Sequence, residues 1–122
     1  MTSNEVAPNE VKPGDVVWVD FPHVESNRRR SRPAVVVASG LGGGYALCWA
    51  LMITGSAREA WPGDVPIDDY RAIGLPIPSA VRTAKISTFL AEEAVPLGRL
   101  NDATWRRVRD CVAAAIAQSA PK

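Results

Sequence analysis

Two polar side chains stand beside apolar segments in a way that suits phosphoryl-transfer chemistry. Arg32 comes directly before Pro33 and an apolar run, and Thr54 ends a second apolar run. A guanidinium has planar donors that fit the charged oxygens of a phosphoryl-transfer transition state, and a hydroxyl adds a directional hydrogen bond. Neither group needs a metal for this. Because Arg-Pro and Ile-Thr pairs are common, on their own they fit ordinary structural roles better than catalytic ones.

Four arginines lie within five positions, at Arg28, Arg29, Arg30 and Arg32. Together with Glu25 they give the segment 25–32 a charge of +3, whereas the whole chain carries only +1. This balance excludes a uniformly basic coat for nucleic acids but allows a local basic patch. The ordinary alternative for such an arginine run is a solvated, solubilising loop.

The segments that must position these residues have the composition of strands. Branched and aromatic residues are frequent in them, and glycine or proline separates one from the next. The predicted strands span residues 15–21, 34–38, 45–53, 64–67, 79–89 and 94–97, of which 79–89 is one long strand or two short ones. One strand starts just after Arg32 and another ends at Thr54, so antiparallel pairing should bring both side chains to one rim of the sheet.

One helix is well marked near the C-terminus. Asn101 can cap its first free amide groups, and Asp102 suits the positive end of its dipole. The predicted apolar face comprises Trp105, Val108, Val112, Ala115 and Ile116, and the opposite face carries Arg106, Arg107 and Arg109. The sequence therefore predicts a mainly β fold, in which a small, strongly bent antiparallel sheet or barrel packs against a C-terminal helix.

The 122 residues fit one domain that buries a core without disulfides or a structural metal. We expect a flexible leader at 1–12, a single domain at 13–117 and a tail at 118–122. Cys48 and Cys111 lack the spacing of a zinc or redox motif, which favours core packing, and with His23 as the only histidine no metal or cofactor is expected. No targeting pattern and no bilayer-length apolar run is present in the sequence, which predicts a cytoplasmic protein without membrane contact.

Five short blocks occur in an order typical of one family. They are Gly14–Pro22, Arg32–Val37, Ile53–Thr54, Gly74–Leu75 with Ser79–Ile86, and Gly98–Leu100. In order and spacing the chain resembles the MazF/PemK toxins of type II toxin–antitoxin systems over residues 13–117. The resemblance implies the fold of the MazF, Kid and CcdB toxins, which is a Src-homology-3-like β-barrel.

The resemblance also implies an activity. Toxins of this family are endoribonucleases that cleave single-stranded RNA, usually mRNA, at short sequences and arrest growth. They act without a metal through attack by the 2′-hydroxyl, which leaves a 2′,3′-cyclic phosphate and a 5′-hydroxyl. They form homodimers with an RNA groove across the interface. An antitoxin with an acidic, partly disordered tail normally silences them, and the complex binds DNA.

Position by position, the resemblance assigns Arg32 to transition-state stabilisation and proton transfer, with Thr54 as its hydroxyl partner. Arg82 matches an arginine that the Kid branch uses as an acid or phosphate ligand. Kid-like members carry an aspartate base two residues later, where this chain has Ala84. A carboxylate base at that place is therefore excluded, and Arg32 with Thr54 is the first choice for catalysis.

The predicted RNA path follows polar residues near these three. It comprises Arg28, Arg29, Arg30, Ser56, Arg58 and Lys85, whose positive charges would neutralise phosphates and make binding salt-dependent. Trp61 fits base stacking and a structural role equally well, whereas Trp18, Trp49 and Trp105 fit the core or an interface. His23 could carry a proton, but a surface position is the ordinary alternative. The segment 25–28 departs from the loop that many relatives have there, which leaves base recognition open.

Two other interpretations stay open. One is a non-enzymatic toxin on the same fold that poisons DNA gyrase, as in the CcdB branch, although that branch relies on a tryptophan-bearing C-terminal end and this chain finishes with Gln118–Lys122. The other is an inactive barrel that only binds RNA or an antitoxin peptide. The presence of Arg32 and Thr54 argues against the inactive barrel.

Overall fold

The computed structural model describes residues 10–23 and 28–119, the side chains of 21–23 and 28–30 excepted. The strands in this part of the chain are β1 (Asp15–His23), β2 (Arg28–Leu41), β3 (Leu47–Gly55), β4 (Asp64–Ile67), β5 (Ser79–Leu90) and β6 (Ala94–Arg99). The helices are α1 (Tyr70–Ile73) and α2 (Asp102–Gln118), and the 3₁₀ turns are η1 (Gly43–Tyr45) and η2 (Ala91–Glu93). The predicted leader and tail lie largely outside the described residues.

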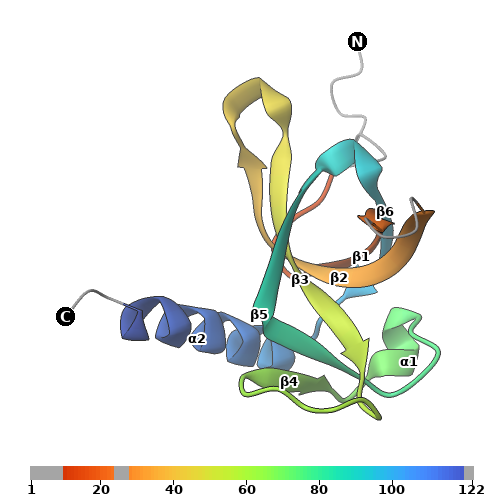
Figure 1. Ribbon diagram of the computed structural model, residues 1–122, viewed down its shortest axis with the longest axis vertical. Helices are drawn as coiled ribbons and strands as arrows, with labels where there is room; N and C mark the ends of the chain where they lie inside the picture. The colour runs from red at the N-terminus through yellow and green to blue at the C-terminus, as the bar shows by residue number, and fades with distance from the viewer. Residues whose placement is uncertain (1–9, 24–27, 120–122) are drawn as a thin grey trace.

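The strands form one antiparallel sheet in the order β4-β5-β3-β2-β1-β6. Strands β4 and β6 are its edges, so hydrogen bonds among the described residues leave the sheet unclosed. The sheet is strongly curved, and α2 lies beside β4 and β5 (Figure 1). The predicted mainly β fold with a bent antiparallel sheet and a C-terminal helix is confirmed, in an open form of the barrel.

Apolar side chains enter two clusters that lie on opposite faces of the sheet. Val16 and Leu51 belong to one cluster together with Val108 of α2. Val17 and Val19 belong to the other cluster. Because successive side chains of a strand point to opposite faces, neighbours in the sequence alternate between the clusters. Helix α2 helps to cover the first cluster, and the strong bend lets the strands of the sheet enclose apolar side chains on both faces.

A bulge in β5 adds to this bend. Ile86 pairs with Leu51, whereas the next residue of β3, Met52, pairs with Arg82. The segment 83–85 of β5 therefore has no opposite residues on β3, and such an insertion bends a strand and re-aims its side chains. One residue of this bulge is Lys85, which borders a small cavity together with Thr54.

Helix α2 begins as the sequence predicts. The Asn101 side chain accepts a hydrogen bond of 2.8 Å from the amide of Thr104, and both Thr104 and Val108 are buried. The apolar face is buried only in its first half, because the second half extends past the sheet (Figure 1) and leaves Ile116 70% exposed. The predicted core packing of the cysteines is confirmed, since Cys48 is fully buried and Cys111 packs against the core.

The start of β2 corrects one prediction. The predicted strand begins at residue 34, after Arg28, Arg29 and Arg30 in a loop, but in the structure these arginines are the first residues of β2 and pair with residues 21–23 of β1. The ladder extends this far because pairing with β1 satisfies backbone groups that an isolated polar segment would leave to water. Within 10–23 and 28–119, no helix is both long and apolar enough to cross a membrane.

Candidate functional site

Arg32 and Thr54 lie on neighbouring strands at one rim of the sheet. The ladder between β2 and β3 pairs Ala34 with Met52, and the same register continued by two residues places Arg32 opposite Thr54. On its other side, Arg32 pairs with Val19 of β1. Both Arg32 and Thr54 are half-buried. The structure thus brings together the two residues that the sequence analysis places first.

These two residues line a cavity of about 240 Å³ at the end of β3. Its apolar wall consists of Trp18, Pro33, Ile53, Leu75, Pro76 and Ile77, and its polar rim of Ser31, Arg32, Thr54, Arg58 and Ser79, with Gly55 between them. The serines are engaged within the protein, since Ser31 donates to the carboxylate of Asp20 and Ser79 to the carbonyl of Ile77. An apolar wall with a few convergent polar groups is the usual form of a ligand site.

A second cavity of about 130 Å³ shares part of this lining. It is bordered by Arg32, Met52, Ile53, Thr54, Arg58, Arg82 and Lys85. Arg32, Ile53, Thr54 and Arg58 line both cavities and therefore form the boundary between them. Among the residues that the structure describes, neither lining contains a carboxylate or a histidine. Four cationic side chains around one small space favour an anionic ligand such as a phosphate.

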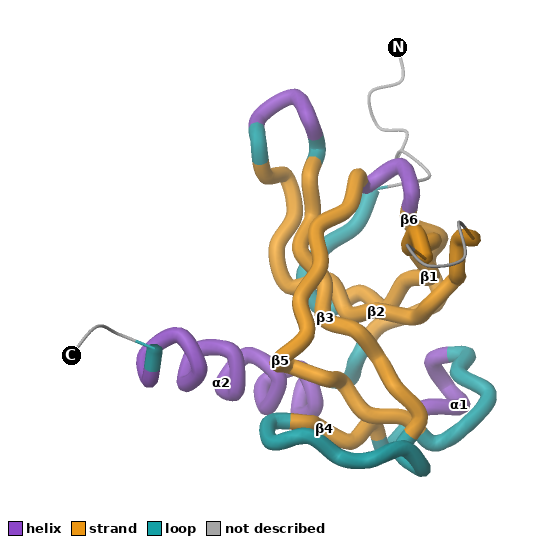
Figure 2. Tube along the Cα trace, viewed as in Figure 1, coloured by secondary structure: helices purple, strands orange, loops and turns teal. Residues whose placement is uncertain are grey.

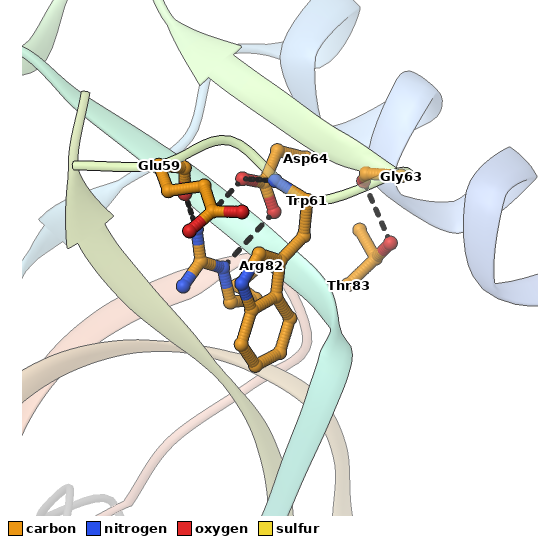
Figure 3. Close-up of polar contacts among 6 residues, drawn as sticks. All are labelled: Glu59, Trp61, Gly63, Asp64, Arg82 and Thr83. Carbon is orange, nitrogen blue, oxygen red and sulfur yellow. Dashed lines mark hydrogen bonds and ion pairs between the residues drawn. The ribbon is translucent and has the colours of Figure 1, made fainter. Parts of the chain in front are cut away.

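Arg82 borders the second cavity. Its guanidinium is held by Asp64 and by the backbone of Glu59 (Figure 3). Its Nε donates to Oδ1 of Asp64 at 3.2 Å, and its Nη2 donates to Oδ2 at 3.0 Å. The same Nη2 donates to the carbonyl of Glu59 at 2.8 Å. The ring of Trp61 covers the guanidinium with a centroid distance of 4.0 Å. The side chains of Arg82 and Asp64 are only 11% and 12% exposed.

The charge state of Asp64 follows from these contacts. Burial alone would raise the pKa of this carboxyl group. The hydrogen bonds from Arg82 and from the amide of Trp61, together with the positive charge of Arg82, outweigh burial and lower the pKa of Asp64. Asp64 is therefore a carboxylate at neutral pH and neutralises one of the four cations around the second cavity.

The remaining predicted site residues lie as follows. Arg58 and Lys85 are exposed and line the second cavity. Ser56 is exposed at the start of the loop after β3 and lines neither cavity. Trp61 was predicted to stack a base or to have a structural role. One face of its ring covers Arg82, which is a structural role, and the side chain is 41% exposed. The side chains of Arg28–Arg30 and His23 lie outside the described part, as does the segment 24–27.

Two parts of the cavity wall were not predicted from the sequence. Trp18, expected in the core or an interface, forms one side of the larger cavity, and Leu75–Ile77 forms another. A signal for Trp18 exists, because the period of two puts it on the same face of β1 as Val16 and next to Pro33 across the ladder. The segment 75–77 is brought here only by the fold. Trp49 is 46% exposed and thus lies outside the core.

Within the described ranges, no group of three or more His, Cys, Asp or Glu side chains could hold a metal ion.

Comparison with known proteins places this geometry in a family. Residues 12–116 match the family described as the PemK-like, MazF-like toxin of type II toxin–antitoxin systems. The match covers most of the chain, so the protein belongs to this family. A search of curated proteins found no match.

Solved structures agree on the fold. An endoribonuclease from a mycobacterial species, in complex with its cognate antitoxin, is 20% identical, with 92% of this chain and 100% of that chain covered and a TM-score of 0.69. MazF of Deinococcus radiodurans in complex with MazE is 18% identical, with 88% and 96% covered and a TM-score of 0.69. The toxin MazF-mt6 of Mycobacterium tuberculosis is 16% identical, with 84% and 96% covered and a TM-score of 0.64. The chain therefore has the MazF fold.

Proposed function

We propose that this toxin is a metal-independent endoribonuclease that cleaves single-stranded RNA, chiefly mRNA in the cytoplasm. The observation that carries the proposal is that Arg32 and Thr54 both line two adjoining cavities, whose described lining residues include cations and no carboxylate. Such a site suits a phosphodiester, whose reacting group is anionic. Membership of the MazF-like family supports this choice of substrate.

The reaction needs little from the protein beyond positioning and charge. The ribose 2′-oxygen attacks the adjacent phosphorus as its proton leaves, the bond from phosphorus to the 5′-oxygen breaks, and that oxygen takes up a proton. The products are a 2′,3′-cyclic phosphate and a 5′-hydroxyl. Arg32 stabilises the charge that develops on the phosphoryl oxygens and assists proton transfer, and Thr54 donates a directional hydrogen bond to one of these oxygens.

The other cations serve binding. Arg58 and Lys85 contact phosphates beside the scissile one, and Arg28, Arg29 and Arg30, with Ser56, extend the RNA path. Arg82, the third predicted catalytic residue, contributes positive charge to the second cavity. Because its Nε and Nη2 are held by Asp64 and Glu59, we assign it charge stabilisation rather than proton donation.

Two partners complete the proposal. A homodimer would extend the RNA path from one protomer to the next. An antitoxin with an acidic, disordered tail would occupy the basic path, compete with RNA, and join the toxin in binding DNA. Such an association depends on charge, so it should weaken as salt rises.

The test is cleavage of a long single-stranded RNA by the purified, antitoxin-free protein in excess EDTA, with the fragment ends mapped. Cuts at one short motif that leave cyclic phosphates are expected. Arg32→Ala should lower the cleavage rate by about a hundredfold or more, and Thr54→Val by about tenfold, because each removes a donor to the developing charge. Arg99→Ala is the matched control, since Arg99 is exposed and lines neither cavity.

Full cleavage by both site variants would remove Arg32 and Thr54 from the mechanism. No cleavage by the folded wild-type protein would overturn the nuclease proposal, and inhibition of DNA gyrase in a supercoiling assay would then favour the non-enzymatic alternative.

A further inference from the structure

The loop between β3 and β4 is fastened to the rest of the molecule at both ends. It is the segment 56–63 (Figure 2) and contains Arg58. At its start, the amide of Ser56 donates to the carbonyl of Pro78 at 2.9 Å. At its end, the hydroxyl of Thr83 donates to the carbonyl of Gly63 at 2.7 Å. These bonds set where the loop leaves the sheet and where it returns, but they do not reach its middle.

The middle of the loop is held by Arg82 and Asp64 (Figure 3). Nη2 of Arg82 reaches the carbonyl of Glu59, which is the residue directly after Arg58. The carboxylate of Asp64 holds the guanidinium through two donors and also accepts the amide of Trp61 at 2.9 Å. One carboxylate and one guanidinium thus tie the backbone at two points of a loop that carries no regular secondary structure.

The result concerns Arg58, which is the only side chain of this loop that lines the two cavities. The backbone amide of Arg58 donates to the carbonyl of Gly55 at 3.1 Å, and the carbonyl of the next residue, Glu59, accepts a hydrogen bond from Arg82. The backbone on both sides of Arg58 is therefore fixed. A long, exposed arginine side chain has many rotamers, so a fixed backbone is what keeps it close to Arg32 and Thr54.

We propose that Asp64 is a positioning residue that acts through Arg82, fixing the loop 56–63 so that Arg58 stays beside Arg32 and Thr54. This inference rests on the proposed nuclease function and changes the role of Arg82. Arg82 then serves cleavage mainly by holding Glu59, with its charge compensated by Asp64. Trp61 covers the pair and limits the access of water to it.

The variant Asp64→Asn separates this role from direct catalysis by Arg82. The asparagine amide group presents a donor where the guanidinium needs an acceptor, so one of the two bonds is lost. If Arg82 acted on the phosphate itself, its release from a carboxylate would leave cleavage unchanged or faster. If Asp64 positions Arg58, kcat/KM should fall by about tenfold or more. Arg82→Lys keeps the charge but loses the two parallel donors of the guanidinium, so its kcat/KM should fall by a similar factor.

A double variant tests whether the effect passes through Arg58. We call the pair of Asp64 and Arg82 the clamp. Arg58→Ala removes the side chain that the clamp positions, so in the Arg58→Ala background Asp64→Asn should lower kcat/KM little further. Independent effects would multiply instead. A purely structural loss would also multiply, because the folded fraction falls equally in both backgrounds. Multiplying effects, or unchanged cleavage by Asp64→Asn, would overturn the proposal.

The chain offers a matched control in Asp15→Asn. Asp15 also accepts a backbone amide, that of Lys12, and an arginine, Arg99, but neither Asp15 nor Arg99 lines the cavities. Cleavage by Asp15→Asn should equal that of the wild type. All variants are compared at a temperature where circular dichroism finds them folded.

A second readout needs no RNA. Trypsin cleaves after arginine, so the rate of cutting after Arg58, followed by mass spectrometry of the native protein, reports how firmly the loop is held. Asp64→Asn should raise this rate about tenfold, and Asp15→Asn should leave it unchanged. If the wild-type protein does not cleave RNA but trypsin still cuts Asp64→Asn faster than the wild type, the clamp would be retained and only the nuclease function would be removed. An unchanged rate in Asp64→Asn would overturn the clamp whatever the RNA assay gives.

Discussion

Two aspartates of this toxin use the same local arrangement in different surroundings. Asp64 and Asp15 each accept a backbone amide from three residues earlier, at 2.9 Å, and each binds an arginine from a strand distant in sequence. In the Asp64–Arg82 pair the side chains are 12% and 11% exposed, whereas in the Asp15–Arg99 pair they are 24% and 55% exposed. One motif thus occurs once beside the cavities and once on the surface.

The difference shows what burial adds to a turn motif. Water screens the Asp15–Arg99 pair and can replace either partner, so removal of one leaves no stranded charge. Around Asp64 and Arg82, the ring of Trp61 and the loop backbone exclude most water. Removal of one partner there strands a charge with little solvent around it, so the whole loop depends on the pair.

The largest expected effect compares Asp64→Ala with Asp15→Ala. The first should lower the free energy of unfolding by about 3 kcal/mol, because the guanidinium of Arg82 would stay largely buried without its counter-ion. The second should cost less than about 1 kcal/mol, as exposed pairs do. Urea unfolding at neutral pH measures both. Equal costs would mean that burial does not distinguish the two pairs.

A smaller effect concerns the turn that leads into Asp64. Gly63 has φ +89°, and a Cβ built there would lie 2.8 Å from Oγ1 of Thr83, the atom that donates to its carbonyl. Gly63→Ala should therefore cost about 2 kcal/mol, from the strained backbone and the displaced hydroxyl together. Gly40→Ala is the control, since Gly40 has φ +68° but no atom within 4 Å of a built Cβ.

Gly40→Ala should lower the free energy of unfolding by about 1 kcal/mol, because only the strained backbone conformation contributes there. Thermal unfolding of the two variants compares them directly. A cost at Gly63 no larger than at Gly40 would show that the hydroxyl of Thr83 moves away freely, and that the end of the loop is not tightly fixed.

The same contrast marks the limit of sequence-based prediction. Alternating apolar residues and turn residues predict the strands, and the helix start follows from Asn101, because these signals are local. Local patterns also bring Arg32 and Thr54 together, since the apolar runs that they flank pair in the core. The fold and the proximity of Arg32 and Thr54 were therefore predictable.

The clamp was not predictable from the same patterns. Asp64 and Arg82 are 18 residues apart, and nothing in the sequence near either distinguishes this pair from Asp15 and Arg99. Their register across β4 and β5, which pairs Asp64 with Arg82, depends on how the segment 68–78 joins the two strands. Such long-range register is a property of the folded sheet rather than of any one segment.

Acid should act on the buried pair in a defined direction. The pKa of Asp64 is lowered in the folded protein from an ordinary value of 3.8. Because its pKa is lower in the folded protein, Asp64 stabilises the fold at every pH above its ordinary pKa. This stabilisation is lost as the pH falls through the pKa that Asp64 has in the folded protein. Between pH 7 and about 5, the difference in unfolding free energy between wild type and Asp64→Asn should therefore be constant, and it should shrink below pH 4. A difference that changes near neutral pH would contradict the assignment.

Salt should produce the smallest effect and should act on the other pair. The screening length falls from about 10 Å at 0.1 M salt to about 3 Å at 1 M, and it applies to charges that solvent reaches. The cost of Asp15→Asn should accordingly fall by a few tenths of a kcal/mol over this range, since Arg99 is more than half exposed. The cost of Asp64→Asn should stay the same, because ions cannot enter between Asp64, Arg82 and the covering ring of Trp61. Urea unfolding of both variants and the wild type at the two salt concentrations measures the difference. A salt-sensitive Asp64 would mean that water and ions reach the pair, and that the loop opens often enough to release Arg58 from the cavities.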